Sequence, residues 1–300
     1  MNSNFLKLPS SMYINHMESD RLSNGEILFS ANFIALHTTD GNNISDVFDL
    51  WAVDRISITG FTQTSEYDIV FVGQYNHCLR IYNRLQGTVN KFAGNCNGWG
   101  FRDGTDALLY WPTSVVQDNQ IPYLFYVIDY FNAALRMVTK SYRHAPLVTT
   151  LLTCYYKSYR HLTQDPSGRY LYITYAKGLE RYDLTTNTSI DIVSRSARHP
   201  NDALMYDGAI VDLGGITLYR DWVLIADSRR YVLFVVDLTT NTTSTICTGV
   251  SGHRSGNSSN CQINLPTSLL ELNGDIYVGE KGGISVLRGT CIYRINYHLF

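Results

Sequence analysis

The most informative stretch of this chain reads Phe92-Ala-Gly-Asn-Cys-Asn-Gly-Trp-Gly-Phe-Arg-Asp-Gly-Thr-Asp-Ala-Leu-Leu-Tyr-Trp-Pro-Thr-Ser-Val115. Gly94, Gly100 and Gly104 permit positive φ, which suits a segment that leaves an outer strand and turns back. Pro112 suits the start of a strand at a position that needs no ladder donor. The stretch is therefore interpreted as a long linker between an outer and an inner β-strand.

Five segments share one pattern, an apolar strand ending in a small or acidic residue, then a short polar turn and a second apolar strand. They are Ile69–Gly73, Phe125–Asp129, Leu171–Tyr175, Val223–Asp227 and Asp275–Gly279. Their last residues lie 56, 46, 52 and 52 positions apart, and a weaker copy, Ile27–Ala31, precedes them by 42. This spacing suits a four-stranded antiparallel sheet with strands of about 5 to 6 residues.

Six such units fill the chain, at approximately 1–50, 51–95, 96–155, 156–200, 201–250 and 251–300. Each sheet has two apolar faces, and repetition around an axis covers all of them. We therefore expect an all-β fold: a single domain, 1–300, that forms a six-bladed β-propeller of four-stranded antiparallel blades. Five or seven blades are the alternatives because the first unit is weak, and the N-terminal segment would alternatively add a strand to the last blade.

In the second unit the expected strands include 68–73, 78–82 and 89–93. In the third unit they are 113–117, 123–129, 133–138 and 147–152.

Two copies of a further motif flank the linker, Asn76-His-Cys-Leu-Arg80 and Asn132-Ala-Ala-Leu-Arg136. With the linker they make the segment from Tyr67 to Lys140, about a quarter of the chain, resemble the NHL repeat. That family shows Asn-His-x-Ile-Arg, then Ala-Gly, Gly-Phe-x-Asp-Gly, an Ala and a Pro. The resemblance thins elsewhere, where Arg230 stands in place of the Asn. It implies a propeller, and it implies function less firmly than fold.

Composition excludes several classes of protein. Hydrophobic residues make up 45% of the chain and aromatic residues 13%, which predicts a large core rather than disorder. The net charge is −2 without a run of five like charges, so no nucleic-acid or anionic-membrane footprint is expected. No apolar stretch reaches the roughly 20 residues of a membrane-spanning helix.

Cellular location is indicated by four Asn-x-Ser/Thr sequons and by six Cys. Both features favour an extracellular or secreted protein. Residues 1–10 lack the charged start and apolar segment of a secretory signal, so this expectation assumes a processed or truncated start.

The sequons have an ordered placement. The hexapeptides at 183–188 and 237–242 are identical and lie at the turn between the third and fourth strands of their units, as does Asn43 in the first unit. Such turns emerge on one face of a propeller. We predict N-glycosylation at Asn43, Asn187, Asn241 and Asn257, the alternative being that Asn-Thr makes a favourable turn.

The opposite face carries two long linkers, 95–111 and 248–266. Aromatic residues with Arg are typical interface anchors. The predicted binding residues are therefore Trp99, Phe101, Arg102 and Tyr110 on the first linker and His253 and Arg254 on the second. For Phe101 and Trp111 the alternative is packing beneath the linker.

Cys247 and Cys261 lie on one linker with Gly, Ser and Asn between them, so we predict that they form a disulfide. It would stabilise the fold by roughly 3 kcal/mol by closing a short loop. Cys78, Cys96, Cys154 and Cys291 remain unassigned.

Some related propellers are enzymes. Peptidylglycine lyases bind zinc through His from different blades, and the eight His here show no metalloprotease spacing. Gluconolactonase-like propellers hold an axial cation with Glu, Asn and Asp. The segments 199–202 and 226–228 resemble their ligand segments, which makes Asn201 and Asp227 candidate calcium ligands without a matching Glu. No nucleophile elbow, phosphate loop or CxxC is present.

We therefore expect a non-catalytic extracellular glycoprotein that acts as an interaction or assembly module, for example in an extracellular matrix. Its partner would be a protein, a glycan or a second copy of the chain, without nucleic acid, a membrane span or a required cofactor. The alternative is a metal-dependent propeller enzyme of the lyase or gluconolactonase kind.

Overall fold

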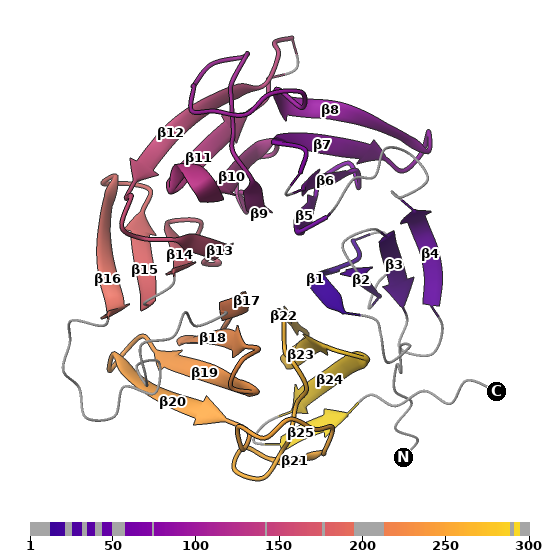
Figure 1. Ribbon diagram of the computed structural model, residues 1–300, viewed down its shortest axis with the longest axis vertical. Helices are drawn as coiled ribbons and strands as arrows, with labels where there is room; N and C mark the ends of the chain where they lie inside the picture. Colours follow the sequence, from indigo (N-terminus) through magenta and orange to yellow (C-terminus); the bar gives the residue numbers. More distant parts are fainter. Residues whose placement is uncertain are drawn as a thin grey trace. The chain divides into compact units, whose positions relative to one another are not determined.

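A computed structural model describes residues 13–21, 26–31, 35–39, 44–49, 58–73, 75–141, 143–175, 178–194, 213–288 and 291–294. The chain forms two compact units. Unit 1 consists of Met1–Phe48, Ala176–Gly178 and Ile192–Phe300, and unit 2 consists of Asp49–Tyr175 and Leu179–Asp191. Figure 1 shows that almost all regular structure is β-strand. Within the described residues no helix is long and apolar enough to cross a membrane.

Unit 2 contains three four-stranded sheets whose strands follow chain order. Every pairing in the described registers is antiparallel. The strands of the first sheet are β5 (Gly60–Gln63), β6 (Ile69–Val72), β7 (Cys78–Asn83) and β8 (Thr88–Gly94). Those of the second are β9 (Pro112–Gln117), β10 (Leu124–Asp129), β11 (Ala134–Thr139) and β12 (Leu147–Thr153). Those of the third are β13 (Tyr159–Gln164), β14 (Tyr170–Tyr175), β15 (Gly178–Asp183) and β16 (Thr188–Ser194).

Unit 1 also contains three sheets. The N-terminal sheet has β1 (Ile14–Ser19), β2 (Ile27–Ala31), β3 (Ala35–Thr39) and β4 (Ile44–Asp49). The next has β17 (Leu213–Tyr219), β18 (Trp222–Asp227), β19 (Val232–Asp237) and β20 (Thr242–Ile246). The last has the order β21-β25-β24-β23-β22, with β21 (Gly256–Asn257), β22 (Ser268–Leu272), β23 (Asp275–Glu280), β24 (Gly283–Arg288) and β25 (Cys291–Arg294).

The sheets correct one expectation. Five of them have the predicted four strands, whereas the last has five, because linker residues Gly256 and Asn257 pair with the outermost strand β25. The expectation of equal four-stranded blades therefore fails for the last sheet. The first described strand, β1, pairs with β2 in its own sheet and not with the last sheet, and residues 1–12 lie outside the described residues.

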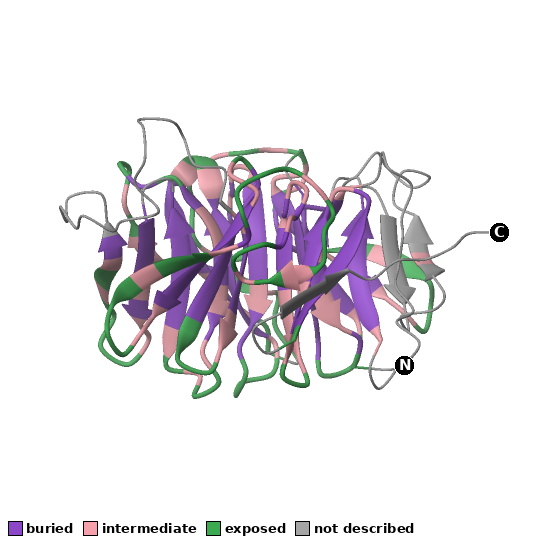
Figure 2. Cartoon of the chain, turned by 90° about the horizontal axis from the view of Figure 1, so that it is seen from below, coloured by how far each residue is buried: buried purple, intermediate pink, exposed green. Residues whose placement is uncertain are grey.

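Burial varies across each sheet in the way that face-to-face packing requires. All six residues of β10, a second strand, are buried, because its two faces are both covered by neighbouring sheets. The outer strand β8 is exposed over most of its first half. Figure 2 shows the same pattern, with buried strands and exposed turns.

The core consists of apolar clusters between successive sheets. In unit 2 one cluster joins Val70 and Leu79 to Phe125 and Val127, and a second joins Ile128 to Ile173. In unit 1 a cluster joins Leu224 to Val278. Another packs Phe29 of the N-terminal sheet against Ile284 and Val286 of the C-terminal sheet. Four-stranded antiparallel sheets that pack face to face are the blades of a β-propeller, so the predicted all-β propeller is confirmed, and the six-bladed ring stays a prediction.

Strand positions agree with the sequence where its signals were strongest. The strands predicted at 78–82 and 147–152 are observed as β7 and β12, each within one residue. The 3-10 helix η1 (Tyr130–Asn132) after β10 was not predicted.

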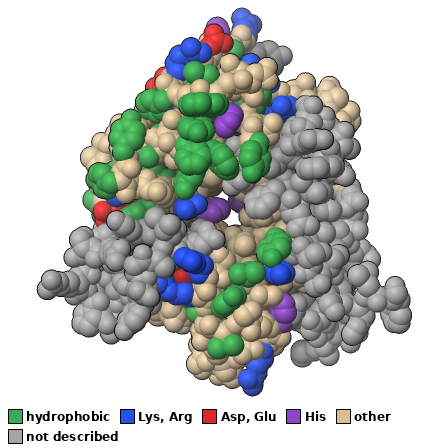
Figure 3. Space-filling model, viewed as in Figure 1, with side chains coloured by type: hydrophobic (Ala, Val, Ile, Leu, Met, Phe, Trp, Pro, Cys, Tyr) green, Lys and Arg blue, Asp and Glu red, His purple; other side chains and the backbone are tan. Residues whose placement is uncertain are grey.

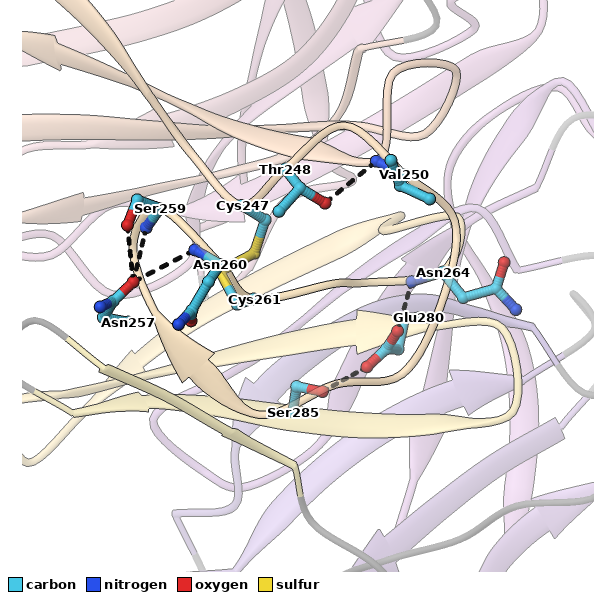
Figure 4. The surroundings of a disulfide bond; sticks show 10 residues. All are labelled: Cys247, Thr248, Val250, Asn257, Ser259, Asn260, Cys261, Asn264, Glu280 and Ser285. Carbon is cyan, nitrogen blue, oxygen red and sulfur yellow. Dashed lines mark hydrogen bonds between the residues drawn. A yellow bond between two sulfur atoms is a disulfide. The ribbon is translucent and has the colours of Figure 1, made fainter.

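Two disulfides tie linkers to the sheets. Cys247 and Cys261 are joined, as predicted (Figure 4). Cys247 directly follows the last residue of β20, and Cys261 lies on the linker that leads to β22. Cys78 of β7 is joined to Cys96, which immediately follows the end of β8. Cys154 is a free thiol, and the side chain of Cys291 lies outside the described residues.

We predict that replacing Cys78 and Cys96 together by Ala lowers the free energy of unfolding by about 3 kcal/mol, because the crosslink limits the unfolded chain. Urea denaturation of the double variant and the parent measures this loss. An unchanged unfolding midpoint would show that the crosslink contributes nothing to stability.

Candidate functional site

The linker from Asn95 to Trp111 is held in place along its whole course. It leaves β8 at Gly94, whose φ of 82° is favoured by glycine, and the disulfide of Cys96 fixes its first residues. Farther along, Arg102 pairs with Leu108 and Gly104 pairs with Val148 of β12. The linker is thus an extension of the sheets rather than a free loop.

A buried ion pair holds the underside of this linker. The guanidinium of Arg136, the third residue of β11, donates to Asp129 Oδ2 at 2.7 Å and to Asp103 Oδ1 of the linker at 2.8 Å. Arg136 and Asp129 are fully buried. Asp103 also accepts from the Thr150 amide at 3.0 Å. We call these contacts between a linker and the sheet that it enters the linker clamp.

The ionisation of the clamp follows from its surroundings. Burial raises the pKa of Asp129 to about 6, although bonds from Asn132, the Tyr110 amide and Arg136 oppose the rise. For Asp103, burial acts in the same direction, but its bonds with Thr150 and the charge of Arg136 hold its pKa below the ordinary value. Both carboxylates are therefore ionised and paired at neutral pH.

The next sheet in unit 2 has a clamp of reversed charge. Glu180 is the third residue of β15, as Arg136 is of β11. The linker supplies a cation, Lys157, whose Nζ lies 3.1 Å from Glu180 Oε2 and 2.7 Å from Asp191 Oδ1. Burial lowers the pKa of Lys157, but the two carboxylates outweigh it and raise the pKa above the ordinary value. The two clamps thus use the same position in the third strand, but the strand residue is a cation in one and an anion in the other.

In unit 1 the last sheet repeats the clamp with a different donor set (Figure 4). Glu280, at the end of β23, accepts the amide of Asn264 at 2.6 Å. Ser285, the third residue of β24, donates to the other carboxylate oxygen, and His253 Nδ1 lies 3.1 Å from Oε2. Burial raises the pKa of Glu280 to about 8, although the bonds from Ser285 and Asn264 oppose it.

The end of each long linker has one geometry. The Tyr110 amide donates to Asp129 Oδ1 at 2.6 Å, and Tyr110 precedes Pro112 by two residues, as Asn264 precedes Pro266. The residues between, Trp111 and Leu265, have φ of 59° and 48°. A carboxyl group at the end of the second strand therefore fixes the turn through which the chain enters the innermost strand.

Above the clamp in unit 2, aromatic rings form a continuous surface. Its members come from the β6–β7 turn, the linker and η1: Tyr75, Trp99, Tyr110, Trp111 and Phe131. We call it the aromatic platform. Figure 3 shows hydrophobic side chains gathered in the half of the view that holds β9 to β12.

The platform rings touch in sequence. Trp99 stacks on Tyr110 with centroids 4.6 Å apart, and Tyr110 meets Phe131 at 4.8 Å. Trp111 lies 4.9 Å from Phe131 and 5.2 Å from Tyr75. Tyr75, Trp99 and Phe131 are nevertheless 67%, 62% and 49% exposed.

Backbone bonds fix the platform from below. The Trp111 amide donates to His77 Nδ1 at 3.2 Å, and the Phe131 amide donates to the Tyr110 carbonyl at 3.1 Å. Burial lowers the pKa of His77, which favours the neutral ring that this bond requires. The exposed rings are thus held in a fixed arrangement before any ligand arrives.

The predicted binding residues divide between the units. Trp99 and Tyr110 stack in the platform. The Arg136 guanidinium lies 4.9 Å from the centroid of the Phe101 ring, and Phe101 is 48% exposed. Arg102 donates to the Asp106 carbonyl at 2.6 Å and braces the linker. In unit 1, His253 contacts Glu280.

Arg254 pairs through its backbone with Gln262 within the second linker of unit 1. It therefore supports that linker's shape. The sequence did not indicate Tyr75 and Phe131 as binding residues, although each lies two residues beyond the end of a recognisable second strand.

The sequons lie in turns with a shared requirement. Asn187 and Asn241 have φ of 56° and 54°, and Gly87 occupies the same place in the β7–β8 turn with φ of 66°. Asn tolerates this conformation better than most residues, so the turn by itself explains an Asn there. Both residues are exposed, as is Asn257, whose Oδ1 accepts the Ser259 and Asn260 amides. Asn43 lies outside the described residues.

The candidate calcium ligands find little support in the geometry. Asp227 Oδ1 accepts the amides of Arg229 and Arg230, and Oδ2 lies 3.4 Å from the Arg230 guanidinium. These donors use the carboxylate that an ion would need. Asn201 lies outside the described residues, among which no cluster of three His, Cys, Asp or Glu is placed to hold a metal.

We predict that Arg136→Met lowers the free energy of unfolding by about 3 to 5 kcal/mol, because it leaves the buried Asp129 without its charge partner. Adding Asp129→Asn should recover part of the loss. Chemical denaturation measures both, with Arg169→Met in an exposed pair with Asp183 as the control that changes little. If Arg136→Met and Arg169→Met lowered the free energy of unfolding equally, the stabilising role of the clamp would be contradicted.

A second prediction concerns pH. Folding keeps Glu280 protonated, with its pKa raised from 4.5 to about 8. Its contribution to stability is therefore complete below the ordinary pKa and is lost as the pH rises through the folded value. Denaturation between pH 5 and 9 should show a fall in stability that Glu280→Gln abolishes. Parallel pH profiles of the two proteins would refute this assignment.

Comparison with known proteins gives fold similarity alone. No family model and no curated protein matches the sequence. An auxiliary nutrient binding protein from Bacteroides thetaiotaomicron is similar in structure, with a TM-score of 0.69, 12% identity and coverage of 92% of this chain and 69% of that one. Virginiamycin B lyase from Staphylococcus aureus is also similar in structure, with a TM-score of 0.62, 10% identity and coverage of 98% of this chain and 88% of that one.

The extracellular domain of a one component system from B. thetaiotaomicron gives a TM-score of 0.58, 12% identity and coverage of 95% of this chain and 42% of that chain. These similarities agree with the β-propeller described above, and the NHL repeat itself stays a prediction.

Proposed function

We propose that this chain is a non-catalytic extracellular binding module, an NHL-like propeller of six blades in one domain, that contacts its partner through the aromatic platform. The observation that carries the proposal is that an exposed aromatic side chain stands on a linker that is firmly held. A disulfide and a buried ion pair hold the linker, yet its Trp99 is 62% exposed. Rigid aromatic side chains lose little conformational entropy on binding, and they anchor many interfaces.

Other features support an extracellular binding role. The two disulfides suit an oxidising compartment. The similar structures include a nutrient binding protein and an extracellular domain. We extend the proposal to N-glycans at Asn43, Asn187, Asn241 and Asn257. In the blade scheme the first three lie at turns on the face opposite the long linkers, and Asn257 lies on the second long linker.

The alternative is a metal-dependent enzyme, and the similarity to a lyase is the observation that favours it. Elemental analysis of the purified protein separates the two proposals. Stoichiometric zinc or calcium together with a lyase or hydrolase activity would favour the enzyme.

The platform is tested by immobilising the protein, Trp99→Ala and Trp222→Ala and exposing each to extracellular fluid of the native source. Trp222 is an exposed Trp of unit 1 outside the platform and provides the matched control. We expect the parent and Trp222→Ala to retain the same protein or carbohydrate, and Trp99→Ala to retain at least about tenfold less, as for an anchor residue. Equal retention by all three proteins would refute the platform as the binding surface.

A further inference from the structure

One cation at the edge of the aromatic platform has no counter-ion among the described residues. The guanidinium of Arg160, on β13, lies over the Tyr130 ring at 4.7 Å from its centroid. Its Nε is buried without a hydrogen-bond partner, and within the described ranges it enters none of the ion pairs. Its backbone carbonyl accepts from Thr113 Oγ1 at 2.9 Å, which fixes the residue in the sheet.

Tyr130 connects this cation to the platform. Its ring lies 5.0 Å from that of Phe131, so the guanidinium is one ring away from the exposed aromatic series. The nearby carboxylates of Asp129 and Asp103 are already paired with Arg136 in the clamp. The platform therefore combines neutral rings with a positive end whose charge is not balanced by a described acid.

The exposed rings favour a ligand that stacks on them. One cavity of about 610 Å³ lies elsewhere in unit 2, lined by residues such as Ile121, Met137 and Leu147. Exposed ring faces in series suit a chain of units that each present a face for stacking, as successive bases do on aromatic side chains.

Hexuronate sugars meet both requirements. One face of the pyranose ring carries C–H groups that pack on an aromatic ring. The carboxylate projects from the ring edge, where it can reach a cation next to the stacked position. A guanidinium binds such a carboxylate through two parallel hydrogen bonds.

We propose that the platform and Arg160 bind a hexuronate-containing oligosaccharide, with sugar rings on Trp99 and Phe131 and a carboxylate on Arg160. This inference rests on the proposed function and names the ligand class of the same surface. It assigns Arg160 a binding role that no sequence motif indicated.

Calorimetric titration with hexameric oligogalacturonate and with its methyl ester tests the proposal, because esterification replaces each carboxylate charge by a neutral methyl ester and leaves the sugar chain unchanged. We expect the acid to bind at least tenfold more tightly than the ester. Arg160→Gln should remove this preference, and Arg160→Lys should keep part of it. Trp99→Ala should weaken binding of the acid at least tenfold, while Trp222→Ala leaves it unchanged.

Circular dichroism and the denaturation midpoint of each variant separate loss of binding from loss of folding. No binding of the acid, or equal binding of acid and ester, would overturn the proposal. With either of these results, the proposed function would still stand if Trp99→Ala reduced capture from extracellular fluid, because the platform would then bind a different partner. If capture is also unaffected, both proposals fall.

Discussion

The linker clamp is the interaction on which the described architecture depends. A blade gains its stability from apolar faces, but the chain must also travel from the outer strand of one sheet to the inner strand of the next. Along this linker, backbone N–H and C=O groups have no strand partner for their hydrogen bonds. A polar or charged residue at the third position of the third strand, bonded to an ionisable side chain of the linker or of the end of the second strand, holds the linker in place. Arg136 with Asp129 shows the arrangement most completely.

Reversal of charge between clamps shows which property matters. Arg136 binds two carboxylates, whereas Glu180 in the same strand position binds Lys157, and Ser285 donates to Glu280. A buried ion requires a partner of opposite sign, but either member can come from the linker. Geometry is therefore conserved within the chain more strictly than residue type, which explains why the repeat motif thins after Lys140 while the sheets continue.

The sequence was sufficient for the fold class because strand length and repeat spacing follow directly from the positions of apolar residues. It indicated Cys247–Cys261 because both residues lie on one linker. It did not indicate Cys78–Cys96, because that pair joins a strand to the linker only after β7 and β8 have formed a hairpin. The platform was half predicted: Trp99 and Tyr110 share the linker, but Phe131 and Tyr75 reach it through tertiary packing.

The same distinction separates structural motifs from function in this protein. Asn132 looks like a signature residue, and its amide is used internally, at 2.7 Å from the Gly100 carbonyl and 2.8 Å from Asp129 Oδ2. Such residues indicate how a linker is held in place. They do not indicate which side chains the linker exposes to a ligand. The residues that face solvent, Trp99 and Phe131, lie outside the clamp's polar contacts and could change without loss of the fold. Because the clamp bears the structural constraint, the exposed surface above it is free to specialise, and a ligand is better inferred from those exposed side chains than from the repeat itself.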